Sequence, residues 1–298
     1  MYRIIYPIIY LFSLLPFFIL YRISDFFYVL LYYVIGYRKE VVLSNISIAF
    51  PEKTVAEKTR IAKQFYKNFV DTLIETVKMI SISTSMFEKR CTMQTEPMIT
   101  MAAKGKSIHL QSGHQMNWEY ANWVASKNCP IPFIGIYQKI SNAAFNKLFY
   151  TLRSKFNTVL VSTIDFKNKK DEILTGQYAL ALAADQNTNP EKCFWLNFFS
   201  KPAPFVTGPA MGAIKNNTAI IFVNFIKPKR GYYHFEATVM AENANEHTAE
   251  QLTLQYKKLL EAAIRKTPDN YLWTHRRWRH EYKAAYSHSW IDDNQPFS

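Results

Sequence analysis

The segment SGHQMNWE, residues 112–119, places the imidazole of His114 and the carboxylate of Glu119 five positions apart. On one helix such residues lie about 140° apart, and on one strand they point to opposite faces. They converge only if the chain turns, which Gly113 and a helix-capping Asn117 favour. The pair would suit general-base catalysis: His114 takes a proton from a substrate hydroxyl, and Glu119 fixes the tautomer and stabilises the imidazolium.

Other catalytic and ligand motifs are absent from the sequence. There is no G-x-S-x-G nucleophile elbow, no G-x-G-x-x-G loop and no H-E-x-x-H or paired Cys/His spacing for zinc. Gly105-Lys106-Ser107 lacks the first glycine of a phosphate-binding loop and precedes a strand instead of following one. On spacing alone an H-x4-E pair is more often structural than functional, so the elements around it decide its meaning.

Strands and helices alternate along most of the chain. Apolar, β-branched stretches predict six strands, at 107–111, 132–137, 158–162, 177–183, 219–225 and 232–239. Helical spacing and capping residues predict helices at 54–79, 118–126, 143–156, 166–174, 207–215 and 248–266. This order indicates an α/β fold with a mixed or mostly parallel sheet and flanking helices. His114 then follows a strand end, where open α/β sheets place ligands.

The first forty residues differ from the rest. An uncharged run at 4–20 is followed by a second apolar run at 26–36, and we expect an N-terminal membrane-anchor helix, or an interfacial hairpin, over residues 1–40. A buried core hairpin and a cleavable signal peptide are the alternatives. Residues 41–298 then form the catalytic domain. Basic residues after the first run favour a cytoplasmic position for that domain.

Composition limits the classes of protein and partner. Hydrophobic residues make up 49% of the chain, which excludes global disorder. Three cysteines without paired spacing favour neither a disulfide framework nor a zinc site. Lys and Arg exceed Asp and Glu by 36 to 23, a net charge of +13 that favours anionic partners such as acidic lipid or an acidic protein. Nucleic acid has no support beyond this charge.

Several motifs in order resemble those of the lipid A biosynthesis (lauroyl/myristoyl-type) acyltransferase family, of the lysophospholipid acyltransferase group. They are NISIAFPE at 45–52, the H-x4-E pair at 114–119, ADQN at 184–187, FFSKPA at 198–203, TGPA at 207–210 and YLWTHRRW at 271–278. The resemblance covers nearly the whole chain. Ile46, Asn187, Ser200 and Trp278 depart from the family pattern.

The resemblance implies a membrane-associated acyltransferase of the bacterial inner membrane, facing the cytoplasm. It would move a fatty acyl chain from acyl carrier protein or coenzyme A to a hydroxyl of a lipid A precursor or related glycolipid, without a metal or other cofactor. By the same resemblance, His114 is the general base and Glu119 its charge partner. Arg153 binds an anionic group of the acceptor, and Asp185 supports the site.

An acyl chain also needs an apolar pocket. Candidate lining residues are Trp195, Phe198, Phe199, Met116 and Trp118. The motifs leave other activities open: an acyltransferase for a lysophospholipid or aminolipid acceptor, a lipid hydrolase that uses the same His/Glu pair on water, or an anchored binding protein without activity.

Overall fold

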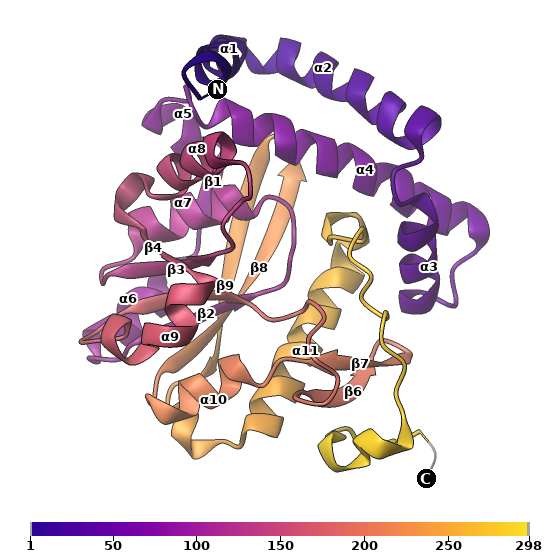
Figure 1. The fold of residues 1–298 in the computed structure, drawn as a ribbon, viewed down its shortest axis with the longest axis vertical. Helices are drawn as coiled ribbons and strands as arrows, with labels where there is room; N and C mark the ends of the chain where they lie inside the picture. Colours follow the sequence, from indigo (N-terminus) through magenta and orange to yellow (C-terminus); the bar gives the residue numbers. More distant parts are fainter. Residues whose placement is uncertain (1, 297–298) are drawn as a thin grey trace.

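Seven strands form one twisted sheet in the computed structural model, which describes residues 2–296 (Figure 1). In sheet order they are β1 (Cys91–Met93), β9 (Tyr232–Ala241), β8 (Ala219–Lys229), β2 (Ile108–Ser112), β5 (Ala179–Ala183), β3 (Phe133–Tyr137) and β4 (Val159–Ser162). Every neighbouring pair is parallel except β8 and β9, which run antiparallel. The predicted mixed, mostly parallel α/β sheet is confirmed.

Helices cover both faces of this sheet. They are α1 (Tyr2–Leu14), α2 (Phe17–Val29), α3 (Lys39–Ala49), α4 (Val55–Lys78), α5 (Thr84–Glu88), α6 (Glu96–Ala103), α7 (Trp118–Asn128), α8 (Ala143–Arg153), α9 (Thr163–Ile173), α10 (Gly208–Lys215) and α11 (Ala249–Lys266). Short helical turns are η1 (Leu30–Ile35), η2 (Lys155–Asn157), η3 (Ala244–Glu246), η4 (Pro268–Asn270) and η5 (Ala284–Ser289). The long helices α4 and α11 both begin at a capping box, as the sequence predicts.

Two apolar cores lie on opposite faces of the sheet. Along β8, Ile220 and Phe222 belong to the core that α11 completes. Ile221 and Val223, one position along, belong to the core that contains Trp123 of α7. Because successive strand residues point to opposite faces, an almost continuous apolar strand fills both cores.

Three short strands were not predicted. β1 has only three residues, too few for a periodic signal. β6 (Phe194–Phe198) and β7 (Lys201–Phe205) form a separate antiparallel pair. Pro202 and Pro204 argue against a strand in the sequence, because proline lacks the N–H of a ladder bond. A two-stranded ribbon tolerates them, since each strand has a free edge.

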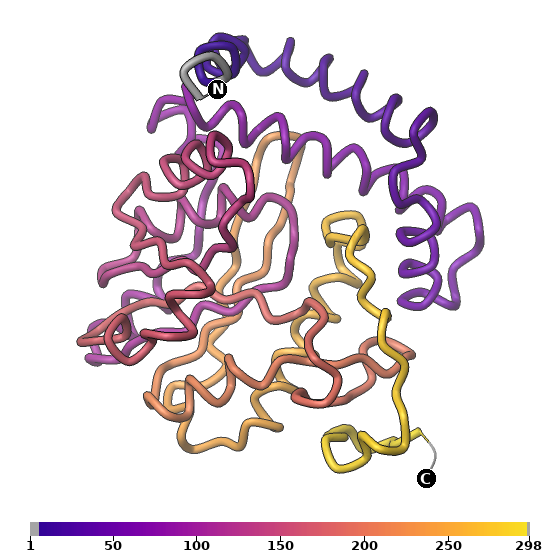
Figure 2. The backbone as a smooth tube through the Cα atoms, in the orientation of Figure 1, coloured from indigo at the N-terminus to yellow at the C-terminus, as the bar shows by residue number. Residues whose placement is uncertain are grey.

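The N-terminal apolar segment packs along α4. Figures 1 and 2 show α2 running beside α4, with α1 at the opposite end of the molecule from η5. Phe17–Ile35 is long and apolar enough to cross a membrane, and 22% of this apolar stretch is buried inside the protein. Ser24 faces α4, where its hydroxyl donates to Asp71 at 2.7 Å. Phe18 and Val34 are each 72% exposed, so one side of the segment packs on protein and the other is apolar and open.

Candidate active site

His114 lies in the turn between β2 and α7, beside the end of β5. Ser112 pairs with Ala183 in the parallel ladder of β2 and β5. His114 and Asp185 follow two residues after these partners, so both emerge at the same edge of the sheet. The Nδ1 atom of His114 lies 2.6 Å from Oδ1 of Asp185, and the His114 backbone N–H donates to Oδ2 at 3.0 Å.

The charges of this pair stabilise each other. Burial alone would raise the pKa of Asp185, but the charge and hydrogen bonds of His114 and the hydroxyl of Tyr271 lower it to about 2. Burial alone would lower the pKa of His114, but Asp185 outweighs it and raises that pKa. An ionised carboxylate at Nδ1 places the proton of the neutral ring there. Nε2 is then free to accept a proton.

The C-terminal segment holds the turn from the other side. The Leu272 N–H donates to the carbonyl of His114 at 2.9 Å, and Gln115 forms a β-bridge with Tyr271. The Met116 N–H donates to the carbonyl of Asn270 at 2.9 Å. The turn is therefore attached to two neighbouring elements, which fixes the direction of the imidazole.

Glu119 does not contact His114 in the way the sequence predicts. Arg153 donates to its carboxylate from Nε at 2.9 and 3.1 Å and from Nη2 at 2.5 Å. The indole of Trp118 donates to it at 3.1 Å. Among the described residues, the hydrogen-bond partner of the His114 ring is Asp185. The reason is geometric: Glu119 lies in the first turn of α7 and points toward the end of α8, whereas Asp185 leaves the strand beside His114.

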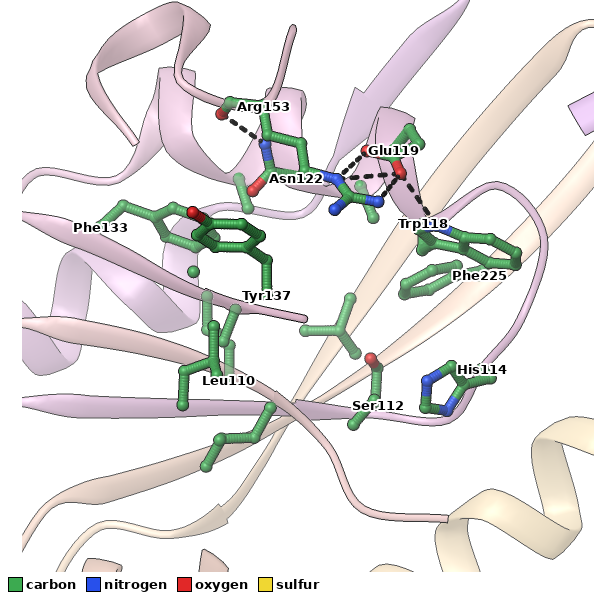
Figure 3. Close-up of a pocket in the computed structure, with 18 of the residues that line it drawn as sticks. Leu110, Ser112, His114, Trp118, Glu119, Asn122, Phe133, Tyr137, Arg153 and Phe225 are labelled. Carbon is green, nitrogen blue, oxygen red and sulfur yellow. Dashed lines mark hydrogen bonds and ion pairs between the residues drawn. The ribbon is translucent and has the colours of Figure 1, made fainter. Parts of the chain in front are cut away.

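A pocket of about 390 Å³ opens between the sheet and α7, with His114, Glu119 and Arg153 in its wall (Figure 3). Its apolar lining includes side chains from β2, β3, β4, β5, β8, β9 and α7; they are Leu110, Phe133, Leu160, Ala181, Val223, Phe225, Phe235 and Ala125. The pocket wall is closely packed at Gly135, where an added Cβ would lie 3.3 Å from the Thr158 methyl carbon and 3.4 Å from Leu160.

Most of the side chains expected to line the pocket lie elsewhere. Trp118 is part of its wall. Met116, Trp195 and Phe198 are fully buried, the first and last of them in the core on the α11 side of the sheet, where Phe199 also packs. Of the five residues proposed from the sequence, Trp118 is the one that lines this pocket. The apolar residues of β3 and β5 that line the pocket give the same pattern in the sequence as ordinary core strands.

No group of three or more His, Cys, Asp or Glu side chains within residues 2–296 is arranged to hold a metal ion. The cysteines Cys91, Cys129 and Cys193 are free thiols. The side chains in and beside the pocket include the acid–base groups His114, Glu119 and Asp185.

His114 and its carboxylate partner thus lie beside an apolar pocket at the carboxyl edge of a mostly parallel sheet, where open α/β sheets place ligands. The family model described as bacterial lipid A biosynthesis acyltransferase matches residues 4–280 of the 298. The chain therefore belongs to this family, as its motifs indicate, and is a transferase that acts on lipid A with an acyl donor. A search of curated proteins found no match.

Proposed function

We infer that this protein transfers a fatty acyl chain from a thioester donor to a hydroxyl of a lipid A precursor, with His114 as the general base. The family provides the reaction class. The observation that supports the base is the contact of 2.6 Å between Nδ1 of His114 and Asp185. It leaves Nε2 as the acceptor atom of a ring that is 27% exposed in the pocket wall.

In the proposed reaction, Nε2 of His114 removes the proton of the acceptor hydroxyl as its oxygen attacks the thioester carbonyl carbon. The tetrahedral intermediate collapses when the carbon–sulfur bond breaks. The leaving thiolate takes the proton back from the imidazolium. Asp185 stabilises the imidazolium during this cycle, the role that the sequence assigned to Glu119.

The apolar part of the pocket would hold the acyl chain. Leu110, Phe133 and Phe225 form walls without charged groups, and His114 and Glu119 lie in the same pocket wall. An acyl chain in this space leaves water, and its carbonyl is then presented to His114. Pocket depth would set the length of the chain that is transferred.

Arg153 would bind an anionic group of the acceptor. Its Nε and Nη2 are used by Glu119, while Nη1 has no hydrogen bond to any other described residue. The side chain is 22% exposed and belongs to the pocket wall. Glu119 holds the guanidinium in place, so that its Nη1 edge remains available to donate to a phosphate or a carbonyl oxygen.

The net charge and the N-terminal segment support the proposed donor and location. A net charge of +13 attracts an acidic carrier protein or the phosphates of coenzyme A. The exposed apolar side of α1 and α2 would insert into the bacterial inner membrane, with the catalytic domain on the cytoplasmic side.

An acyl-transfer assay tests this proposal. Purified protein and His114→Ala are incubated with acyl-carrier-protein and acyl-coenzyme A donors and a tetraacyl lipid A precursor, and products are measured by mass spectrometry. An added acyl mass that His114→Ala fails to produce is expected. Free fatty acid without an acylated lipid would identify a hydrolase, and acylation only of a lysophospholipid or aminolipid would replace the acceptor.

The acyl pocket is tested by narrowing it. Ala125, in the pocket wall on α7, is 6% exposed, and Ala125→Phe is expected to shift the preferred donor to a chain shorter by several carbons. Ala56→Phe, at an exposed position of α4, is the matched control and should keep the wild-type preference. An unchanged preference in Ala125→Phe would place the acyl chain elsewhere.

A further inference from the structure

A buried carboxylate lies behind the turn that carries His114. Glu75, on α4, is 0% exposed. Its Oε1 accepts from the hydroxyl of Tyr21 at 3.0 Å. Its Oε2 accepts from the hydroxyl of Tyr233 at 2.7 Å and from Nδ2 of Asn117 at 3.1 Å. Three donors from α2, β9 and the turn before α7 thus meet on one side chain, outside the pocket.

Asn117 connects this carboxylate to the active site. Its Oδ1 caps α7 by accepting from the Tyr120 N–H at 3.2 Å, and its Nδ2 donates to Glu75. His114 lies three residues before it and Glu119 two residues after it. The two ends of the Asn117 amide therefore join the start of α7 to α4.

Asp71, one helical turn earlier on α4, is a natural comparison. It is also buried and accepts from Ser24 at 2.7 Å, from Arg230 at 2.6 Å and from Lys227 at 3.2 Å. These partners belong to α2 and to the β8–β9 hairpin. Glu75 is hydrogen-bonded to Asn117, in the segment that joins His114 to α7. Among the described residues, Asp71 has no hydrogen bond to that segment.

We propose that Glu75 is a positioning residue for acyl transfer, which holds Asn117 and thereby directs His114 and Glu119 into the pocket. The proposal depends on the function proposed for His114. It requires the acceptor oxygens of Glu75 more than its charge. A glutamine keeps an acceptor at Oε2 for Tyr233 and Asn117, and the Tyr21 hydroxyl can rotate to accept from the new amide.

The decisive experiment exchanges the carboxylate of Glu75 and the amide of Asn117 between the two positions. Asn117→Asp keeps the cap of α7 but sets a second carboxylate against Glu75, and we expect kcat to fall by about 30-fold or more, with KM for the acyl donor within about threefold. Glu75→Gln alone should stay within about fivefold of wild type. The double variant, in which donor and acceptor are reversed across the contact, should recover kcat to a similar level.

Control variants separate an effect on the position of the catalytic side chains from an effect on the stability of the protein. Asp71→Asn should lower Tm, because it weakens the ion pairs of Arg230 and Lys227, but should leave kcat of the folded protein within about threefold. If Asn117→Asp does not fold, Asn117→Ser keeps a capping oxygen and is too short to reach Glu75. It should lose kcat about tenfold, without recovery by Glu75→Gln.

Failure of the role proposed for Glu75 can be distinguished from failure of the role proposed for His114. Wild-type kcat in both Asn117→Asp and Asn117→Ser, or a double variant no better than Asn117→Asp, would overturn the positioning role. If His114→Ala is inactive at the same time, the general base stands and only the role of Glu75 fails. Activity in His114→Ala would overturn the base itself.

Discussion

Strand β2 and the turn after it each carry a histidine, and the two environments are opposite. His109, within the strand, is 2% exposed and packs near Gly212 of α10, on the face away from the pocket. Burial lowers its pKa to about 4, a shift that the backbone of Pro209 only partly opposes. His114, past the strand end, is next to Asp185, which raises its pKa.

The two pKa values shift in opposite directions because only His114 has a carboxylate partner. Burial by itself lowers the pKa of both rings. Within the sheet, the neighbours of His109 across the ladders are Leu180 and Ile220, which provide no carboxylate. Past the strand ends, the side chains no longer need to be apolar. Asp185 lies beside the imidazole of His114 at this edge of the sheet, where the ring also reaches the pocket.

The largest expected effect is loss of the base. His114→Ala should lower kcat by about 10³-fold, as removal of a general base does. His109→Leu, the control on the same strand, should keep kcat within about threefold. Steady-state acyl transfer of both folded variants checks this, and similar losses in the two would show that the comparison reports packing instead of catalysis.

Loss of the carboxylate partner should come second. Asp185→Asn should lower kcat on the order of 10²-fold, because the imidazolium loses its stabilising charge. In the wild type, activity should fall as the pH drops through the raised pKa of His114, since the protonated ring accepts no proton. Without Asp185 that pKa falls, so the acid limb of the pH–rate profile should move to lower pH. An unmoved limb would exclude Asp185 as the partner.

Glu119 offers a smaller, more discriminating test. Glu119→Gln weakens its contacts with Arg153 and should reduce activity about tenfold, chiefly through KM for the acceptor. Because Glu119 does not touch His114 in this structure, the acid limb of the pH–rate profile should stay in place. A shift of that limb would mean that Glu119 reaches the imidazole once substrate is bound, as the H-x4-E spacing indicates.

The last prediction concerns stability and leaves acyl transfer itself unchanged. The unfolded chain protonates His109 near pH 6.5 and the folded protein near pH 4, so the unfolded state binds more protons between these values. Stability should fall by roughly 3 kcal/mol as the pH drops from 6.5 to 4, at about 1.4 kcal/mol per unit. His109→Leu should remove this part of the acid sensitivity. Urea unfolding between pH 4 and 6.5 measures the free energy of unfolding of both proteins. The same dependence of that free energy on pH in wild type and His109→Leu would contradict the prediction.

The sequence predicts the sheet better than the site. Six of the strands, and the long helices behind capping boxes, follow from periodicity and turn chemistry, which act locally. The contact between His114 and Asp185 depends on which strands become neighbours and in which register, and periodicity does not specify either. Glu119 shows the same limit: its spacing from His114 requires a turn, but not the direction in which α7 leaves it.

Pocket residues were hardest to predict for a related reason. Ala181 and Gly135 look like ordinary core residues in the sequence, since small side chains occur wherever elements approach closely. The structure places both in the pocket wall, opposite residues of α7. The resemblance to a family supplied the chemistry that the local pattern could not, although it did not identify the partner of the imidazole.

The distance in sequence between His114 and Asp185 has a consequence for biogenesis. They are 71 residues apart, and they meet only when β2 and β5 have paired in the register that aligns Ser112 with Ala183. Parallel pairing over such a separation forms slowly compared with local structure. A nascent or partly folded chain therefore has an imidazole without its carboxylate, so catalytic competence is acquired late, and activity itself reports that the sheet has been completed correctly.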